Sequence, residues 1–195
     1  MVGHYCDPLE SVYTHALGHF YGLPMFSLAG ASDSKVVDQP AAAEAALSLL
    51  SNTLGGGNII HDIGYLEAGL TFSLAQLAIC DDLVGWIRHF AAPLEINAET
   101  LALDVIHEVG PDGQFLDHPH TIRHYKERFY PALLDRNPFE VWEERGGKTL
   151  VQRAGERVDR ILAEHHVDPL PAEVAGRLRQ IVQRAETMHA TSIST

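Results

Sequence analysis

The sequence has few cysteines, few basic residues and no long hydrophobic segment. Two of its 195 residues are cysteines, Cys6 and Cys80, which is too few for a disulfide framework, and no CxxC spacing is present. Lys and Arg total 14 against 26 Asp and Glu, which gives a formal net charge of -12. This balance argues against binding to nucleic acid or to an anionic membrane surface, because both attract basic proteins.

No apolar run approaches the roughly 20 residues that cross a bilayer. The first ten residues, MVGHYCDPLE, also lack the basic and apolar regions of a secretory signal. Together with the sparse cysteines, these absences predict a cytoplasmic protein that does not enter a membrane. Hydrophobic residues make up 46% of the chain, which is enough apolar material for one sizeable core.

The first half of the sequence alternates between helical and strand patterns. The predicted order is helix 8–22, strand 24–30, helix 40–54, strand 58–61 and helix 73–90. Asp38 is a suitable N-cap for the second helix, and the glycines at 55–57 end it. This alternation is typical of a parallel α/β architecture, and both strands are apolar throughout, as strands buried on two faces tend to be.

From Pro93 onward every periodic segment has helical spacing. The sequence therefore predicts an α/β segment over 1–92 and a helical region over 93–195 that packs on it. Two strands cannot make a stable parallel sheet alone, and a complete (β/α)₈ barrel needs about 250 residues. We expect either part of a longer enzyme or a chain that buries its sheet edges against a partner.

Polar residues gather in the two loops that follow the predicted strands. In α/β folds, ligands bind at the carboxyl ends of the strands, so these loops are the candidate site. Gly64 and Gly69 permit tight turns or a close approach to a ligand. The functional groups in the two loops are Asp33, Ser34, Lys35, Asp38, His61, Asp62, Tyr65 and Glu67.

Three stretches resemble the trimethylamine:corrinoid methyltransferase family, which includes the glycine betaine:corrinoid methyltransferases. They are SDSKVVDQPAAAEAAL, GNIIHDIGYLEAGLTFSLAQLAICDD and ETLALDVIHEVGPDGQFLDHPHTIRHYKERFYP. The resemblance extends from about Tyr21 to Ala185. It implies a (β/α)₈ TIM barrel, of which this chain resembles the C-terminal portion, with two short parallel strands and a helical extension.

The resemblance also implies a reaction. A methyl group leaves a quaternary or tertiary amine and passes to the Co(I) corrinoid (cobalamin) of a separate partner protein, and no metal is bound by the methyltransferase directly. The trimethylamine enzymes of the family carry pyrrolysine near the position of Asp33 and Ser34, where this sequence has ordinary residues. This difference favours a quaternary amine, which already carries its positive charge and needs no separate activation.

Several loop residues have chemistry that suits this reaction. We expect His61 and Glu67 to be catalytic, with His61 and Gly64 also facing the corrinoid. A histidine near its pKa can hydrogen-bond in either protonation state, while Glu67 or Asp33 balances the ammonium charge. Lys35 would pair with a substrate carboxylate, and an aromatic face from Tyr65 or Phe72 would contribute about 0.5–2 kcal/mol of cation–π attraction.

Each of these residues also has a purely structural interpretation. His61 can cap the sheet, and Glu67 can favour the positive end of the third helix. Lys35 can form a solvated loop ion pair with Asp33 or Asp38, which contributes little to stability. Tyr65 and Phe72 can be core residues, and Cys80 fits a small buried hydrophobe.

A second cluster of polar residues lies at 117–124. His118, His120 and His124 follow Asp117 closely, and the i, i+4 spacing of His120 and His124 can place two imidazoles on one metal ion. The sequence shows no remote third ligand, and helix capping near His120 and Thr121 is an alternative explanation.

Three functional hypotheses remain open at this point. The first is a corrinoid-dependent amine methyltransferase, whether active or inactive as an isolated chain. The second is a non-catalytic, truncated half-barrel that forms a homo-oligomer or complements a missing N-terminal half. The third is a metal-dependent enzyme that uses His118, His120 and His124.

Overall fold

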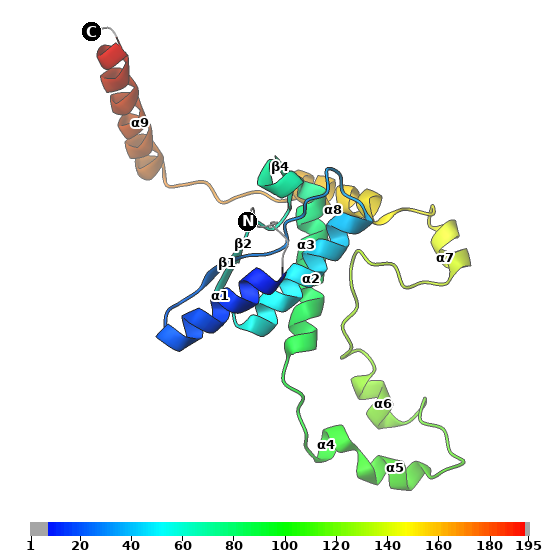
Figure 1. Ribbon diagram of the computed structural model, residues 1–195. Coiled ribbons are helices and arrows are strands. Elements are labelled where there is room, and N and C mark those ends of the chain that lie inside the picture. Colours follow the sequence, from blue (N-terminus) through cyan, green and yellow to red (C-terminus); the bar gives the residue numbers. More distant parts are fainter. Residues whose placement is uncertain (1–7, 194–195) are drawn as a thin grey trace. The chain divides into compact units, whose positions relative to one another are not determined.

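A computed structural model describes residues 8–193 and shows a helix-dominated α/β chain (Figure 1). Every helix in this range is too short or too polar to span a bilayer. The elements are α1 Pro8–Tyr21, β1 Phe26–Leu28, α2 Gln39–Gly55, β2 Ile59–His61, β3 Tyr65–Leu66, the 3₁₀ turn η1 Glu67–Gly69, β4 Thr71–Phe72, α3 Leu74–Ala91, α4 Ala98–Leu101, α5 Leu103–Val109, α6 Pro119–His124, α7 Phe139–Glu144, α8 Leu150–Glu164 and α9 Ala172–Ile193.

The two predicted strands form a parallel pair, with Phe26 opposite Ile59 and Leu28 opposite His61. The predicted loop over 62–69 contains more structure than expected, since β3 pairs with β4 in an antiparallel two-residue hairpin. Strands this short have too few residues to show an alternating pattern. Within residues 8–193 the strands form these two small sheets and no closed barrel.

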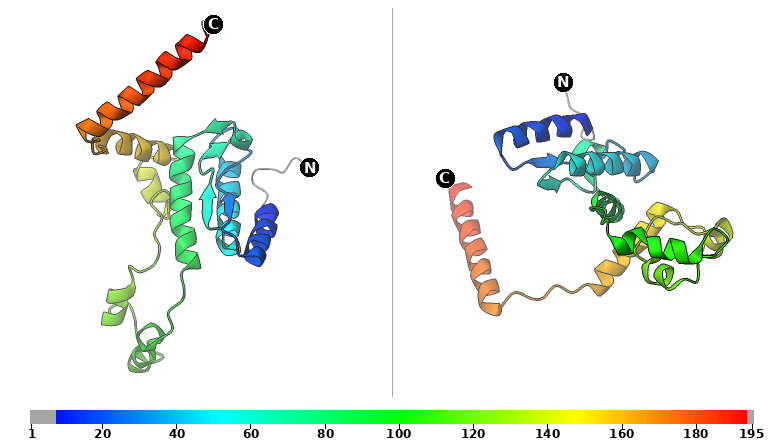
Figure 2. Two further views of the ribbon diagram at one scale, coloured as in Figure 1. Left: turned by 90° about the vertical axis from the view of Figure 1, so that its left-hand side faces the viewer. Right: turned by 90° about the horizontal axis from the view of Figure 1, so that it is seen from below.

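The three predicted helices of the first half are present within one or two residues of their expected ends. Asp38 caps α2 by accepting a hydrogen bond from Ala41 N, and Gly56 ends it in the left-handed conformation with φ 81°. α2 packs against α1, α3 and β1 (Figure 2). The core lies between these elements and also receives residues from farther along the chain; its buried members are Ala29, Ala45, Leu49, Ala78, Ile79, Cys80, Leu83, Leu133 and Ala154.

The parallel pair has one covered face and one open face. Ser27 and Ala29 are buried on the side of α2. On the opposite face, Phe26 and Ile59 are each at least 60% exposed and Leu28 is 39% exposed. Because side chains alternate across a strand, His61, which is opposite Leu28, lies on this open face.

Described residues after Pro93 contain helices and no strand, as the sequence predicts. The helical pattern over 99–110 is broken at Ala102, where φ is 47°. Farther along, Asp82 of α3 accepts hydrogen bonds from the backbone N–H groups of Ala132 (2.7 Å) and Leu133 (3.1 Å), which ties that segment to the core.

The chain separates into two compact units, one ending at Arg160 and the other beginning at Ile161. The second unit contains the long helix α9, Ala172–Ile193. Val174, Leu178 and Ile181 occupy helical spacing on it, and each is exposed.

Candidate functional site

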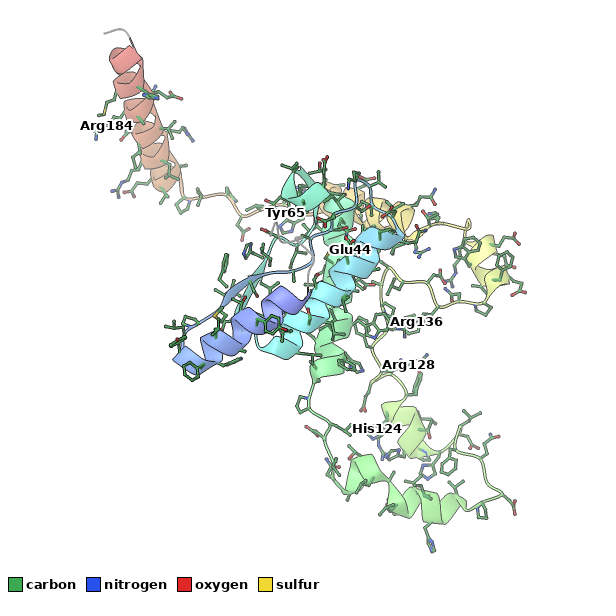
Figure 3. The ribbon with its side chains drawn as sticks, in the orientation of Figure 1. Glu44, Tyr65, His124, Arg128, Arg136 and Arg184 are labelled. Atoms are coloured by element: carbon green, nitrogen blue, oxygen red, sulfur yellow. The ribbon has the colours of Figure 1, made fainter. Side chains whose placement is uncertain are left out.

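The loop after β1 is organised by a carboxylate of α2. Ser32 is fully buried, and its hydroxyl donates to Glu44 Oε2 at 2.5 Å. The backbone N–H of Asp33 donates to the same oxygen at 2.9 Å, and Ser34 N–H donates to Ser32 Oγ at 2.9 Å. Glu44 (Figure 3) therefore holds the loop in place. Sequence reasoning missed it, because an acidic residue in an alanine-rich helix gives no local signal.

The predicted ion pair between Lys35 and a neighbouring aspartate takes a different form. The Lys35 ammonium donates to the backbone carbonyl of Asp33 at 2.8 Å, and Lys35 is exposed. The Asp38 carboxylate accepts from Ser34 Oγ at 2.8 Å and from Ala41 N at 3.1 Å. Asp38 therefore joins the loop to the start of α2, while the Lys35 ammonium bonds to the backbone of its own loop.

The loop after β2 has an unusual backbone. Asp62, Glu67 and Ala68 have φ values of 69°, 51° and 52°, in the left-handed region that non-glycine residues rarely adopt. They are three of the four non-glycine residues with positive φ in the described part of the chain; the fourth is Ala102. Strained conformations of this kind cluster at binding and catalytic sites.

Backbone hydrogen bonds join the two loops. Ser32 N–H donates to the carbonyl of Tyr65 at 3.0 Å, and Glu67 N–H donates to that of Ser34 at 2.9 Å. The predicted residues of the first loop thus lie beside Tyr65 and Glu67 of the second. The Glu67 carboxylate accepts from Thr71 Oγ1 at 3.0 Å, and Glu67 is exposed.

His61 lies at the end of β2 with its side chain 32% exposed. Its ring stacks on Phe26, with centroids 3.9 Å apart and an interplanar angle of 14°. Its Nδ1 is 2.7 Å from Asp62 Oδ1. These two contacts hold the imidazole ring of His61 on the open face of the sheet.

The two predicted aromatic residues face each other across the small hairpin. The Tyr65 and Phe72 rings meet edge to face with centroids 5.6 Å apart. Phe72 is 49% exposed, so this aromatic pair is accessible to solvent and is not part of a buried core. Gly64 is buried beneath it with φ 90°, and a Cβ there would lie 3.0 Å from Leu77 Cβ and 3.1 Å from Phe72 Cε2. Both the positive φ and the close packing of Leu77 and Phe72 therefore favour glycine at this position.

The histidine-rich segment forms a separate cluster. His120 and His124 lie beside Glu99 of α4, whereas His118 lies 3.7 Å from Glu108. Hydrogen bonds from His124 and Arg123 lower the pKa of Glu99 to about 2, and hydrogen bonds to Glu99 and Glu127 raise the pKa of His124. A carboxylate that the sequence did not reveal thus lies beside the two histidines, 21 residues before His120.

Comparisons with known proteins place these features in context. The family model for trimethylamine methyltransferase (MTTB) matches residues 7–189. Trimethylamine methyltransferase MttB from Desulfitobacterium hafniense (strain DSM 10664 / DCB-2) is 35% identical over 178 residues, which is 91% of this chain and 36% of the relative. The trimethylamine methyltransferase MttB of Methanosarcina barkeri has the same identity and coverage.

Glycine betaine methyltransferase from Desulfitobacterium hafniense (strain Y51) is 33% identical over 168 residues, which is 85% of this chain and 35% of that protein. The chain therefore spans about a third of the length of the curated relatives that it matches. Because its identity to both kinds of methyltransferase is nearly equal, identity alone does not choose between the two amines.

Proposed function

Because this chain belongs to the trimethylamine methyltransferase family, we propose that it forms part of a methyltransferase that moves a methyl group from a quaternary amine to a corrinoid carried by a partner protein. The observation that carries this proposal is the pair of joined loops after β1 and β2. These loops bring acidic, aromatic and histidine side chains together beside an open sheet face.

The open face supports a barrel segment. In a (β/α)₈ barrel, helices cover the outer face of the strands, and the inner face is covered by side chains of the other strands. Here α2 covers one face, and the apolar side chains of Phe26, Leu28 and Ile59 occupy the other. We assign residues 1–92 to a segment of the barrel wall from its C-terminal portion, and residues 93–195 to a helical region that follows it.

The charges of the two loops suit an ammonium substrate. Over 31–38 and 61–69 the sequence has four carboxylates, Asp33, Asp38, Asp62 and Glu67, against the single amine of Lys35. An excess of one sign raises the local concentration of ions of the other sign. Tyr65 and Phe72 add exposed aromatic surface on which a quaternary ammonium group binds favourably.

Three of these side chains receive specific roles in the proposal. Glu67 and Asp33 balance the charge of the ammonium, and Lys35 binds the carboxylate when the amine is a betaine. A quaternary nitrogen departs as a neutral amine once it loses the methyl group, so no proton has to be supplied to it.

The residues at the end of β2 and in the loop after it also fit a corrinoid. His61 is partly exposed on the open face, and its ring is held by Phe26 and Asp62, which leaves Nε2 for a further hydrogen bond. When bound, the corrinoid supplies the methyl acceptor. In this proposal His61 positions it or the substrate, while Gly64 acts through the shape of the loop, since it is buried.

Two of the strands of a barrel make only part of a pocket, so we expect the remaining wall to come from further strands, supplied by a longer polypeptide, by a separate N-terminal half or by another copy of the chain. A non-catalytic module is the alternative, and the same assay separates it from the methyltransferase.

The test is anaerobic methylation of reduced cobalamin, followed as loss of Co(I) absorbance with glycine betaine, trimethylamine or no amine. It should use both this chain and the longest protein that its gene encodes. The proposal predicts consumption of Co(I) that requires the quaternary amine, and a loss of at least tenfold in rate for His61→Ala.

His165→Ala is the matched control, because His165 is exposed in the second unit and has no role in the proposed site. Its rate should equal that of the wild type. Equal rates for His61→Ala and the wild type would remove His61 from the site. Absence of transfer with every amine, in the longest protein as well, would favour the non-catalytic module.

A further inference from the structure

A compact set of potential metal ligands lies outside the loops of the proposed methyl-transfer site. Glu99 of α4 and the pair His120 and His124 of α6 each offer one ligand atom, and these atoms all lie within 4.8 Å of one another. The two histidines are one helical turn apart, with ring centroids 4.4 Å apart (Figure 3 labels His124). Two imidazoles and one carboxylate from two separate helices therefore converge at one point.

The distances are close to those that a bound ion requires. Zinc binds imidazole nitrogen and carboxylate oxygen at about 2.0–2.2 Å, so two ligands of a tetrahedral site lie about 3.3 Å apart. His124 Nε2 is 2.9 Å from Glu99 Oε1, and His120 Nε2 is 3.9 Å from the same oxygen. His120 Nε2 also lies 2.9 Å from the backbone carbonyl of Glu99, a contact that an ion bound at this nitrogen would replace.

A second carboxylate orients one of the histidines. Glu127 Oε1 lies 2.7 Å from His124 Nδ1, the ring nitrogen that points away from Glu99. Histidines that bind metals almost always donate their other ring N–H to a carboxylate, a carbonyl or water, which fixes the tautomer and strengthens the ligand. Glu127 is placed to accept such a bond from His124 Nδ1 while Nε2 faces Glu99.

The cluster is open to solvent on one side. The side chains of His120 and His124 are 19% and 28% exposed, and that of Glu99 is 55% exposed. An ion can therefore enter, and water can complete its coordination. Arg123 also approaches Glu99 Oε1, at 2.9 Å, so its guanidinium competes with an ion for this carboxylate.

We propose that Glu99, His120 and His124 bind a divalent transition-metal ion, with Zn²⁺ as the best match to two imidazoles and one carboxylate. The ion would hold α4 against α6 and close the chain between residues 99 and 124. This site is independent of the proposed methyl transfer, because its ligands come from neither of the two loops.

The test is titration of metal-stripped, tag-free protein with Zn²⁺ by calorimetry, and with Co²⁺ by visible absorption, which reports a tetrahedral nitrogen and oxygen environment. The proposal predicts one ion per chain. It also predicts at least a tenfold loss of affinity in each of Glu99→Gln, His120→Ala and His124→Ala. His107→Ala is the matched control: His107 is an exposed histidine on α5 and should leave binding unchanged.

Two further variants test the geometry without removing a ligand. Glu127→Gln should weaken binding by roughly tenfold through the loss of its contact with His124, and Arg123→Gln should strengthen it by removing the competing cation. Circular dichroism confirms that each variant remains folded. Weak binding of several ions, or an affinity that His107→Ala reduces as much as His124→Ala does, would overturn the proposal.

Discussion

At Gly64 the chain turns where a side chain would be crowded and the backbone strained. Its φ of 90° is unfavourable for any other residue. A Cβ added there would lie 3.0 Å from Leu77 Cβ and 3.1 Å from Phe72 Cε2, which is closer than most Cβ contacts. The glycine allows the strained loop that bears Tyr65 and Glu67 to return directly into β4 and α3. The absence of a side chain at Gly64 thus permits the conformation of the loop after β2.

Replacement of Gly64 by alanine should therefore destabilise the fold by about 1–3 kcal/mol, through backbone strain and overpacking. Gly155→Ala is the matched control, because no atom lies within 4 Å of a Cβ built there. Alanine at this position in α8 should stabilise the helix by about 0.5–1 kcal/mol. Urea unfolding measures both changes, and equal effects at the two sites would contradict this account.

Cys80 illustrates how burial alters chemistry at one atom. It is fully buried and its thiol donates to Gly30 O at 3.4 Å, while burial raises its pKa to about 11. In a Cys6→Ala variant, the thiol should react slowly with a disulfide reagent at pH 8 and rapidly once the protein is unfolded in urea. Fast reaction in the native state would show that Cys80 is accessible.

The same residue predicts a loss of stability at alkaline pH. The unfolded thiol loses its proton near pH 9.0, whereas the folded thiol keeps it up to about pH 11. Between these values the folded state binds more protons, so a rise in pH favours unfolding. The free energy of unfolding should fall between pH 9 and 11, and Cys80→Ala should reduce that slope. An unchanged slope in this variant would contradict the assignment.

At the scale of elements, α2 both packs the core and shapes the first loop. Its N-cap Asp38 accepts from Ala41 N and from Ser34 Oγ, and its Glu44 accepts from Ser32 and Asp33. Helix start and loop conformation therefore depend on one another. A substitution at Asp38 should therefore alter the conformation of the first loop as well as the stability of α2.

Asp38→Ala should lower the free energy of unfolding by about 1–2 kcal/mol, because a capping hydrogen bond is lost. The neighbouring exposed residue supplies the control: Gln39→Ala should change stability by no more than about 0.5 kcal/mol. Urea unfolding followed by circular dichroism provides the comparison. Similar losses in the two variants would mean that the cap contributes nothing of its own.

Local signals explain which elements the sequence predicts correctly. Asp38 and the glycines at 55–57 act within a few residues of the helix ends they determine, so the bounds of α2 follow from the sequence. The strands 26–28 and 59–61 follow from short apolar runs, and their parallel pairing follows from the helix between them. These features are encoded where they occur.

Contacts between distant segments explain what sequence reasoning missed. Glu44 reaches Ser32 from another element, and Glu99 reaches His124 across 25 residues. Neither contact has a spacing that a motif could reveal. The helix break at Ala102 also lacks the glycine or proline that would predict it from the sequence. Charge pairing and backbone strain of this kind are decided by tertiary structure.

At the scale of the whole molecule, this chain matches about a third of the length of its relatives, and the proposed barrel would place its remaining strands beside β1 and β2. The pair β1–β2 has no further strand on either edge among residues 8–193. Its open face carries apolar side chains that other strands of a barrel would cover. Unpaired edges and exposed apolar faces favour association with another chain.

Sedimentation velocity of the isolated chain tests directly whether the open face of β1 and β2 is a surface that other strands cover. Leu94→Ser is the control, because Leu94 is 86% exposed in a loop outside the sheet. The wild type and Leu94→Ser should form dimers or larger species at micromolar concentration, whereas Phe26→Ser and Ile59→Thr should be monomeric. A wild-type chain that stays monomeric throughout, or association that the sheet variants leave unchanged, would contradict the account.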